Sequence, residues 1–317
     1  MYKARLNAEK ATETIMKAAE CQFLHIEDIA YELINNGYER EDLLSSDNFA
    51  FDYRKACEAL ETVSDHPENC AKGFYRAMRG ALSALSKAYL CASICRIREE
   101  GGHKIRISSF FDNFMLPVNT KIAYVKNSYS DAAYRVFADT LTGASVTYCG
   151  NFAAVCEEVY YSRAGYCILP YETSDEGVLS SFRQLISKYE LVSILTFPVQ
   201  TDNGLGGRIT RFALLSKGFH TIEGLSDSSK TVGGRYLKIT VDTPTGEAIS
   251  DIMSAAHCNG LTHFKTESIP IAWDEEHYSC AITFSFGDAD PLPFLLYLAL
   301  EFPESSPESI YTSLLST

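Results

Sequence analysis

The sequence predicts a protein of the α/β class joined to an α+β unit, with a helical region ahead of both. Three observations lead to this prediction. Apolar residues recur at three- and four-residue spacing in the first 115 residues. Strand and helix patterns then alternate from Lys121, and the segment 235–317 reads strand, helix, strand, strand, helix. These patterns indicate packed helices, a helix-covered sheet and a smaller α+β layer, in that order.

The region 1–115 is predicted to be a helical domain. The helical spacing is clearest in 8–34 and 72–100. Asn36-Gly37 and Asp65-His66-Pro67 interrupt it, and Gly101-Gly102 ends the last long helix, as glycine commonly does after a helix.

The region 120–218 is predicted to be an α/β lobe. Strands are expected at 121–125, 144–149, 165–172 and 191–199, and helices at 130–141, 152–163 and 178–189. Strands that alternate with helices indicate a mainly parallel, twisted sheet with helices on both faces.

The region 235–317 is predicted to be a ferredoxin-like domain. A strand at 237–243 and a helix at 246–260 are followed by strands at 261–273 and 278–286 and a helix at 290–302, with a closing strand near Ile310. This order is typical of the ferredoxin-like arrangement.

Composition excludes several classes of partner. The net charge of −13 argues against nucleic acid and against anionic membranes, both of which require clustered basic residues. No run of about 18 apolar residues is present to span a bilayer. Ten cysteines without a secretory signal indicate reduced thiols, so we expect a cytoplasmic protein.

Neither a cofactor nor a metal ion is predicted. The glycines of 204–207 lack the following Lys-Ser/Thr of a phosphate loop. A metal site would need His257, Cys258, His263, His277 and Cys280 to converge, and their expected elements do not bring them together.

Three motifs in order resemble prephenate dehydratases. Residues 168–177 (ILPYETSDEG) match the family's apolar pair, proline, Glu-Asn-Ser and glycine at the same spacing. Tyr129 and Ser130 match the aromatic-serine pair after the first strand, where the family's preceding glycines are replaced. Thr210-Arg211-Phe212 matches the family's Thr-Arg-Phe signature. The lobe 120–218 thus resembles one lobe of a periplasmic-binding-protein-like fold.

The resemblance implies a set of site residues. The family's signature threonine assists loss of the ring hydroxyl, so Thr210 would be the catalytic general acid. Substrate contacts would come from six further positions, which are Ser130, Thr173, Ser174, Gly177, Arg211 and Phe212. The residues support this independently, because Ser130 begins a helix and Thr173 and Ser174 follow a strand, where α/β sheets bind ligands.

A second lobe is predicted to be missing. The family inserts another α/β lobe with a Ser-His-Pro motif before Thr-Arg-Phe, and that motif is absent from the chain. Pro198 and Thr210 are too close for a βαβ unit, which needs about 30 residues. The expected cleft therefore lacks one wall, unless another domain or subunit supplies it.

The tail resembles the ACT domain that follows dehydratase domains. Thr266 to Pro270 stands at the Glu-Ser-Arg-Pro position, and Gly246 opens a helix as the ACT glycine does. The resemblance implies an effector site at Gly246, Glu267 and Ser268 and a homodimer. Ile269 in place of arginine departs from phenylalanine-specific binding. A dimerisation module without ligand is the alternative.

The helical region occupies the place of chorismate mutase in bifunctional relatives, and 75–90 resembles that enzyme's last helix. The family has a glutamine near Leu90, and leucine donates no hydrogen bond. We therefore expect a degenerate mutase-like domain.

Two functions follow. The first is a catalytically impaired relative that binds an aromatic acid or amino acid and acts in regulation. The second is an active dehydratase that converts prephenate to phenylpyruvate, water and carbon dioxide, with Thr210 as general acid.

Overall fold

A computed structural model of the chain describes two compact units. The described residues are 25–36, 47–63, 72–102, 104–111, 114–201, 207–222, 232–242, 245–271 and 274–315. Unit 1 draws on 1–110, 240–284 and 288–306, and unit 2 on 111–239, 285–287 and 307–317.

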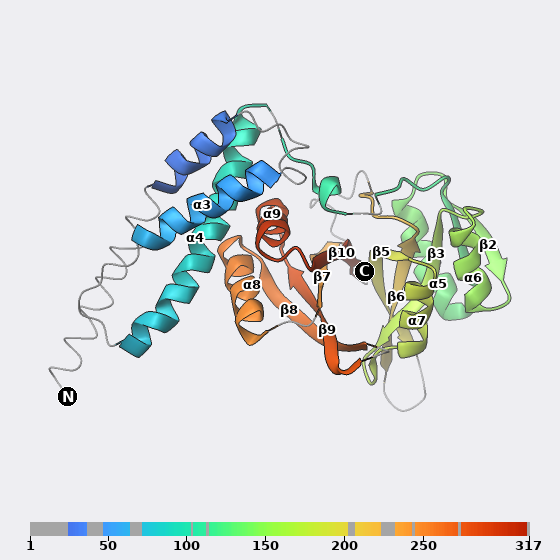
Figure 1. The fold of residues 1–317 in the computed structure, drawn as a ribbon. Helices are drawn as coiled ribbons and strands as arrows, with labels where there is room; N and C mark the ends of the chain where they lie inside the picture. The colour runs from blue at the N-terminus through green and yellow to red at the C-terminus, as the bar shows by residue number, and fades with distance from the viewer. Residues whose placement is uncertain are drawn as a thin grey trace. The chain divides into compact units, whose positions relative to one another are not determined.

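Unit 2 is built on a mixed sheet (Figure 1). Its strands are β1 (Lys121–Val125), β2 (Ser145–Cys149), β3 (Tyr166–Thr173), β4 (Gly177–Val178), β5 (Val192–Thr201), β6 (Arg208–Ser216), β7 (Val232–Asp242, to Ile239) and β10 (Ser305–Leu314, from Pro307). The strand order is β2-β1-β3-β6-β5-β10-β7, and β4 pairs with β3. β1 runs parallel to β2 and β3, and β10 runs parallel to β5.

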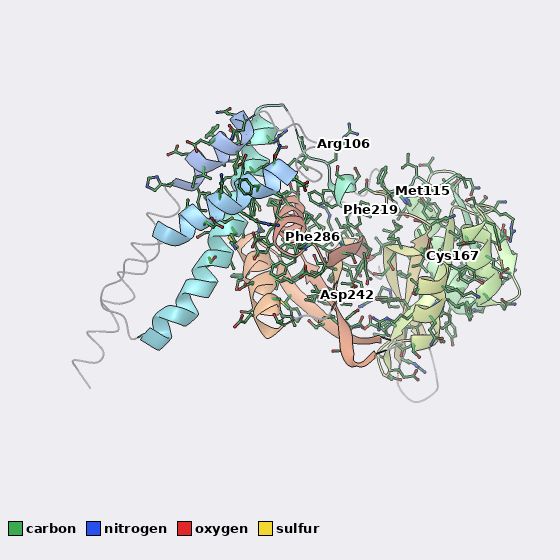
Figure 2. The ribbon with its side chains drawn as sticks, viewed as in Figure 1. Arg106, Met115, Cys167, Phe219, Asp242 and Phe286 are labelled. Atoms are coloured by element: carbon green, nitrogen blue, oxygen red, sulfur yellow. The ribbon has the colours of Figure 1, made fainter. Side chains whose placement is uncertain are left out.

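Helices cover both faces of this sheet, as the sequence predicts. Helix α5 (Ser128–Thr140) buries Ala133 and Phe137 against one face, in a cluster with side chains of β1, β3, β5 and β6. Helices α6 (Phe152–Tyr160) and α7 (Ser180–Lys188) pack on the other face with fully buried Cys167 of β3 (Figure 2). The alternating strand residues therefore fill two separate cores.

The expectation of a mainly parallel sheet is wrong around β6. This strand runs antiparallel to both β3 and β5. Only residues 202–207 separate β5 from β6. So short a connection joins antiparallel neighbours, because a parallel pair needs a crossover of a dozen or more residues. The pattern of 209–217 (ITRFALLSK) predicts a strand there but carries no information on its direction.

Unit 1 contains helices from both ends of the chain. They are helical residues 25–35, α3 (Asp47–Val63), α4 (Lys72–Glu100), the short 3-10 helix at Ile107–Phe110, α8 (Gly246–Cys258) and α9 (Leu292–Glu301). Helix α4 packs against α3, α8 and α9, and Lys87 of α4 pairs with Glu301 of α9 at 2.8 Å. Strands β8 (Thr262–Ile271) and β9 (Asp274–Ser285) complete the unit.

The element order from β7 onward is strand, helix, strand, strand, helix, strand, which matches the predicted βαββα with its closing strand. Helix α8 begins at Gly246 because Thr245 caps it, its Oγ1 accepting a hydrogen bond from the amide of Ala248 at 3.1 Å. The division into domains at 1–115, 120–218 and 235–317 stays a prediction.

Candidate ligand site at the ends of β3 and β6

Thr173 of β3 and Thr210 of β6 lie directly beside each other on two neighbouring strands. They are directly opposed residues of the antiparallel pair β3 and β6, so both side chains project from the same face of the sheet. Phe212, two residues after Thr210, packs in the core beneath α5, which identifies that face as the one covered by α5. Both threonines are buried, and Thr210 is 8% exposed.

The hydroxyl of Thr173 is held by a cation and a backbone amide. Arg208 of β6 donates from Nη2 to Thr173 Oγ1 at 3.1 Å, and the amide of Glu176 donates to it at 3.2 Å. Arg208 also donates to the Glu176 carboxylate at 3.0 Å. The turn after β3 is thus tied to β6 through one guanidinium, which has enough donors to serve several acceptors.

Ser174 and Gly177 shape this turn. The Ser174 amide donates to the carbonyl oxygen of Ile209 at 2.9 Å, and the Ile209 amide donates to Ser174 Oγ at 3.3 Å. Gly177 has φ +69°, a backbone conformation that side chains other than glycine rarely adopt. The two residues therefore have structural roles here, which add to those that the resemblance implies.

Ser130 lies on the buried side of the first turn of α5 and is 1% exposed. It shares the α5 face with the two threonines, at the end of the sheet where β1 and β3 finish. Asn127 caps the helix, accepting from the amides of Tyr129 at 3.1 Å and Ser130 at 2.8 Å. These two amides of the helix start therefore already donate to Asn127.

Arg211 and Phe212 project from opposite faces of β6. Phe212 belongs to the core under α5, whereas Arg211 donates from Nη1 to Glu172 Oε2 at 3.0 Å on the face covered by α6 and α7. The structure therefore sets Thr173, Thr210 and Phe212 on the α5 face of the sheet, with Ser130 on the buried side of α5, and places Arg211 on the opposite face. Strand alternation predicts this separation.

Two residues of this region, Asn127 and Arg208, belong to none of the motifs that predicted the site. Asn127 carries a recognisable signal, because asparagine is a preferred N-cap and stands shortly before the predicted helix at 130–141. Arg208 is two positions before Thr210 and so lies on the same side of β6. Its contact with Thr173 depends on the pairing of β3 with β6, which has no local signal in the sequence.

The predicted effector residues lie in unit 1. Gly246 is the first residue of α8 and is exposed, with open space where a Cβ would stand. Glu267 and Ser268 lie on β8, and Glu267 pairs with Lys265 on its own strand at 2.9 Å. Their role as an effector site stays a prediction.

Leu90 is fully buried in unit 1 and belongs to its hydrophobic core. The position therefore has a packing role. Among the described residues, no three His, Cys, Asp or Glu side chains gather into a group suited to a metal ion. No helix in the described part of the chain combines the length and apolar character that crossing a bilayer requires.

No protein-family model matches the chain, and no curated protein matches it. Solved structures are similar to it. Prephenate dehydratase from Streptococcus mutans is 20% identical with a TM-score of 0.47, over 62% of this chain and 99% of that one. The quorum-quenching acylase GqqA is 19% identical with a TM-score of 0.44, over 61% and 95%. Prephenate dehydratase from Arthrobacter aurescens, in complex with L-Phe, is 14% identical with a TM-score of 0.42, over 60% and 89%. All three TM-scores are below 0.5.

Proposed function

We propose that this chain is a prephenate-dehydratase-like protein that binds a small aromatic acid or amino acid and acts in regulation. One observation carries the proposal. The register of β3 and β6 sets Thr173 directly opposite Thr210, on the face of the sheet covered by α5, whose first turn buries Ser130. Each of the three motifs that resemble the family contributes one of these hydroxyl-bearing residues. Hydroxyl groups near an Arg208 guanidinium suit a carboxylate ligand.

Binding is favoured over turnover by three features. The Thr210 side chain is 8% exposed. The Thr173 hydroxyl already accepts two hydrogen bonds. Residues 202–207, the whole connection from β5 to β6, are too few for a second α/β lobe, which supports the proposal that this wall of the dehydratase cleft is missing. Dehydration needs a closed cleft that excludes water and orients both leaving groups.

The proposed architecture has a mutase-like helical domain at 1–115, a dehydratase-like lobe at 120–218 and an ACT-like domain at 235–317. We propose that the last of these forms a homodimer. Gly246 at the start of α8 supports an effector site there, since its lack of a side chain leaves the helix amides open to a carboxylate.

An active dehydratase is the second candidate. The Thr210 hydroxyl stands opposite Thr173, whose own hydroxyl contacts the Arg208 cation. A cation in this position would favour the negative charge of a bound prephenate carboxylate. In this role Thr210 would donate a proton to the departing ring hydroxyl while carbon dioxide leaves.

One set of measurements on the purified full-length chain tests both candidates. Phenylalanine, tyrosine and prephenate are added separately while thermal unfolding is followed, and phenylpyruvate formation is monitored with prephenate. We expect at least one ligand to raise the melting temperature, with no phenylpyruvate formed. At 100 times its Kd, a ligand adds about 2.7 kcal/mol to the free energy of unfolding.

Thr210→Val is the diagnostic variant and Thr312→Val is its matched control. Thr312 lies on β10 in register with Leu195. The ligand response should fall in Thr210→Val and persist in Thr312→Val. Phenylpyruvate formation that Thr210→Val abolishes would replace the binding proposal with the dehydratase. A response to none of the three ligands, without turnover, would overturn both.

A further inference from the structure

A pocket lies between α7 and the sheet of unit 2, on the face opposite Thr173 and Thr210. It encloses about 500 Å³ of empty space, its open mouth included. Residues of α7, β3, β5, β7 and β10 line it. The lining strands lie on both sides of β6 in the sheet, with β3 on one side and β5, β10 and β7 on the other.

One buried hydroxyl in this pocket has no hydrogen-bond partner among the described residues. Thr196 of β5 is 1% exposed and lines the pocket, and its Oγ1 accepts and donates no hydrogen bond there. The register sets Thr196 opposite Ala213, which packs in the core under α6 and α7, so the side chain projects toward α7. A buried hydroxyl without a partner destabilises the fold, and such groups commonly bind water or a ligand.

The charged lining favours an anion. It comprises two cations, Arg183 of α7 and Lys238 of β7, and one carboxylate, Glu308 of β10. Lys238 and Glu308 form an ion pair with each other. Nearby, Arg211 and Glu172 form a second pair. The charged side chains of the lining therefore sum to one net positive charge, and the Arg183 guanidinium offers five donors in a planar fork.

The remaining lining suits an apolar or aromatic body. Ile186 and Leu191 contribute aliphatic surface, and the rings of Tyr171 and Tyr311 contribute aromatic surface. Tyr311 stacks on Tyr236 with ring centroids 5.3 Å apart, which fixes its ring. Burial raises the pKa of Tyr311, so its hydroxyl stays protonated and able to donate a hydrogen bond.

We propose that this pocket binds a small organic monocarboxylate with an apolar body, whose carboxylate meets the Thr196 hydroxyl and the Arg183 guanidinium. The site is separate from the Thr173–Thr210 region, because the two lie on opposite faces of the sheet. The pocket is thus a second small-molecule site of the chain. Its proposed ligand does not depend on the function proposed for the Thr173–Thr210 region.

Benzoate is the test ligand, titrated into the purified full-length chain by calorimetry. Benzamide has the same shape without the charge, and benzylamine carries the opposite charge. We expect saturable binding of benzoate about tenfold or more tighter than binding of benzamide, since a hydrogen bond to a charged group outweighs a neutral one. Benzylamine should not bind.

Three variants and one control locate the site. Thr196→Val preserves shape and removes the hydroxyl, and should weaken benzoate about tenfold, whereas Thr196→Ser should retain binding. Arg183→Gln should weaken it by more than about tenfold. Thr312→Val, the same substitution on a neighbouring strand, should leave the affinity within about twofold. Circular dichroism and melting temperature confirm that each variant is folded.

The proposal is overturned if benzoate shows no saturable binding, if benzamide binds as tightly, or if folded Thr196→Val and Arg183→Gln both bind benzoate like the parent. A separate check distinguishes the two sites. Thr196→Val should leave unchanged any thermal response that depends on Thr210.

Discussion

The Nε2 atom of His220 lies 3.0 Å from the hydroxyl oxygen of Tyr166, inside unit 2. The other ring nitrogen, Nδ1, lies 3.1 Å from the carbonyl oxygen of Gly218. A carbonyl oxygen only accepts, so Nδ1 carries the proton and Nε2 accepts from Tyr166. The neutral imidazole is therefore fully satisfied, with one donor and one acceptor in use.

This arrangement predicts a loss of stability in mild acid. Burial lowers the pKa of His220 from its ordinary value of 6.5. The unfolded chain binds a proton more readily, so the stabilising contribution is present above pH 6.5 and is lost as the pH falls through the lower folded pKa. Denaturant unfolding followed from about pH 7.5 to about pH 5 should show this decline. His220→Gln should flatten it, and an equal decline in that variant would contradict the assignment.

Gly165→Ala is expected to destabilise unit 2 by about 1–3 kcal/mol or more. A Cβ at Gly165 would collide with the carbonyl oxygen of Asn119, and backbone cannot move aside as a side-chain end can. The Gly165 amide also donates to Asn119 Oδ1 at 2.9 Å, which holds the two segments together. Gly150→Ala is the control, because nothing lies within 4 Å of its Cβ position. Urea midpoints of the two variants give the comparison, and equal midpoints would refute the close approach.

Removing the cap of α5 should cost about 1 kcal/mol of stability. Asn127→Ala deletes the oxygen that accepts from the amides of Tyr129 and Ser130. Asn127→Asp keeps an acceptor in the same place, and should restore most of the free energy of unfolding. Denaturant titration of both variants measures the effect. A stability unchanged by Asn127→Ala would show that water replaces the cap without loss.

Arg208→Gln is expected to loosen the turn after β3 with little effect on global stability. Its partners Asp175 and Glu176 are largely exposed, and exposed ion pairs contribute about 0–1 kcal/mol. The turn itself loses the guanidinium that links it to β6. Hydrogen exchange should accelerate at 174–177, whereas Arg163→Gln, which removes another surface pair with Glu158, should leave that segment unchanged. Unaltered exchange at 174–177 in Arg208→Gln would show that the backbone hydrogen bonds of Ser174 are enough to hold the turn against β6.

Local pattern predicted the elements of unit 2 well. The strand at 121–125 appears with those bounds, and the helix at 152–163 appears as Phe152–Tyr160. Apolar alternation and helical spacing are properties of neighbouring residues, so the sequence displays them directly. The separation of Arg211 from Phe212 also follows from alternation along a single strand.

Long-range pairing could not be predicted in the same way. The sequence suggested a closing strand near Ile310, but nothing local indicates that β10 lies between β5 and β7. The pocket beneath α7 depends on that order, since Thr196 and Tyr311 come from strands that are distant in the chain. The Thr173–Thr210 register depends likewise on β6 entering between β3 and β5. Pairings of this kind are decided by packing of the whole sheet.

The place of β10 has a consequence for folding during synthesis. Thr312 of β10 pairs in parallel with Leu195 of β5. This edge of β5 therefore stays unpaired until the ribosome has synthesised the chain through β10. Unpaired strand edges promote association between nascent chains. Unit 2 should therefore depend on chaperones more than a unit whose strands are contiguous. A chain halted before β10 should aggregate through β5.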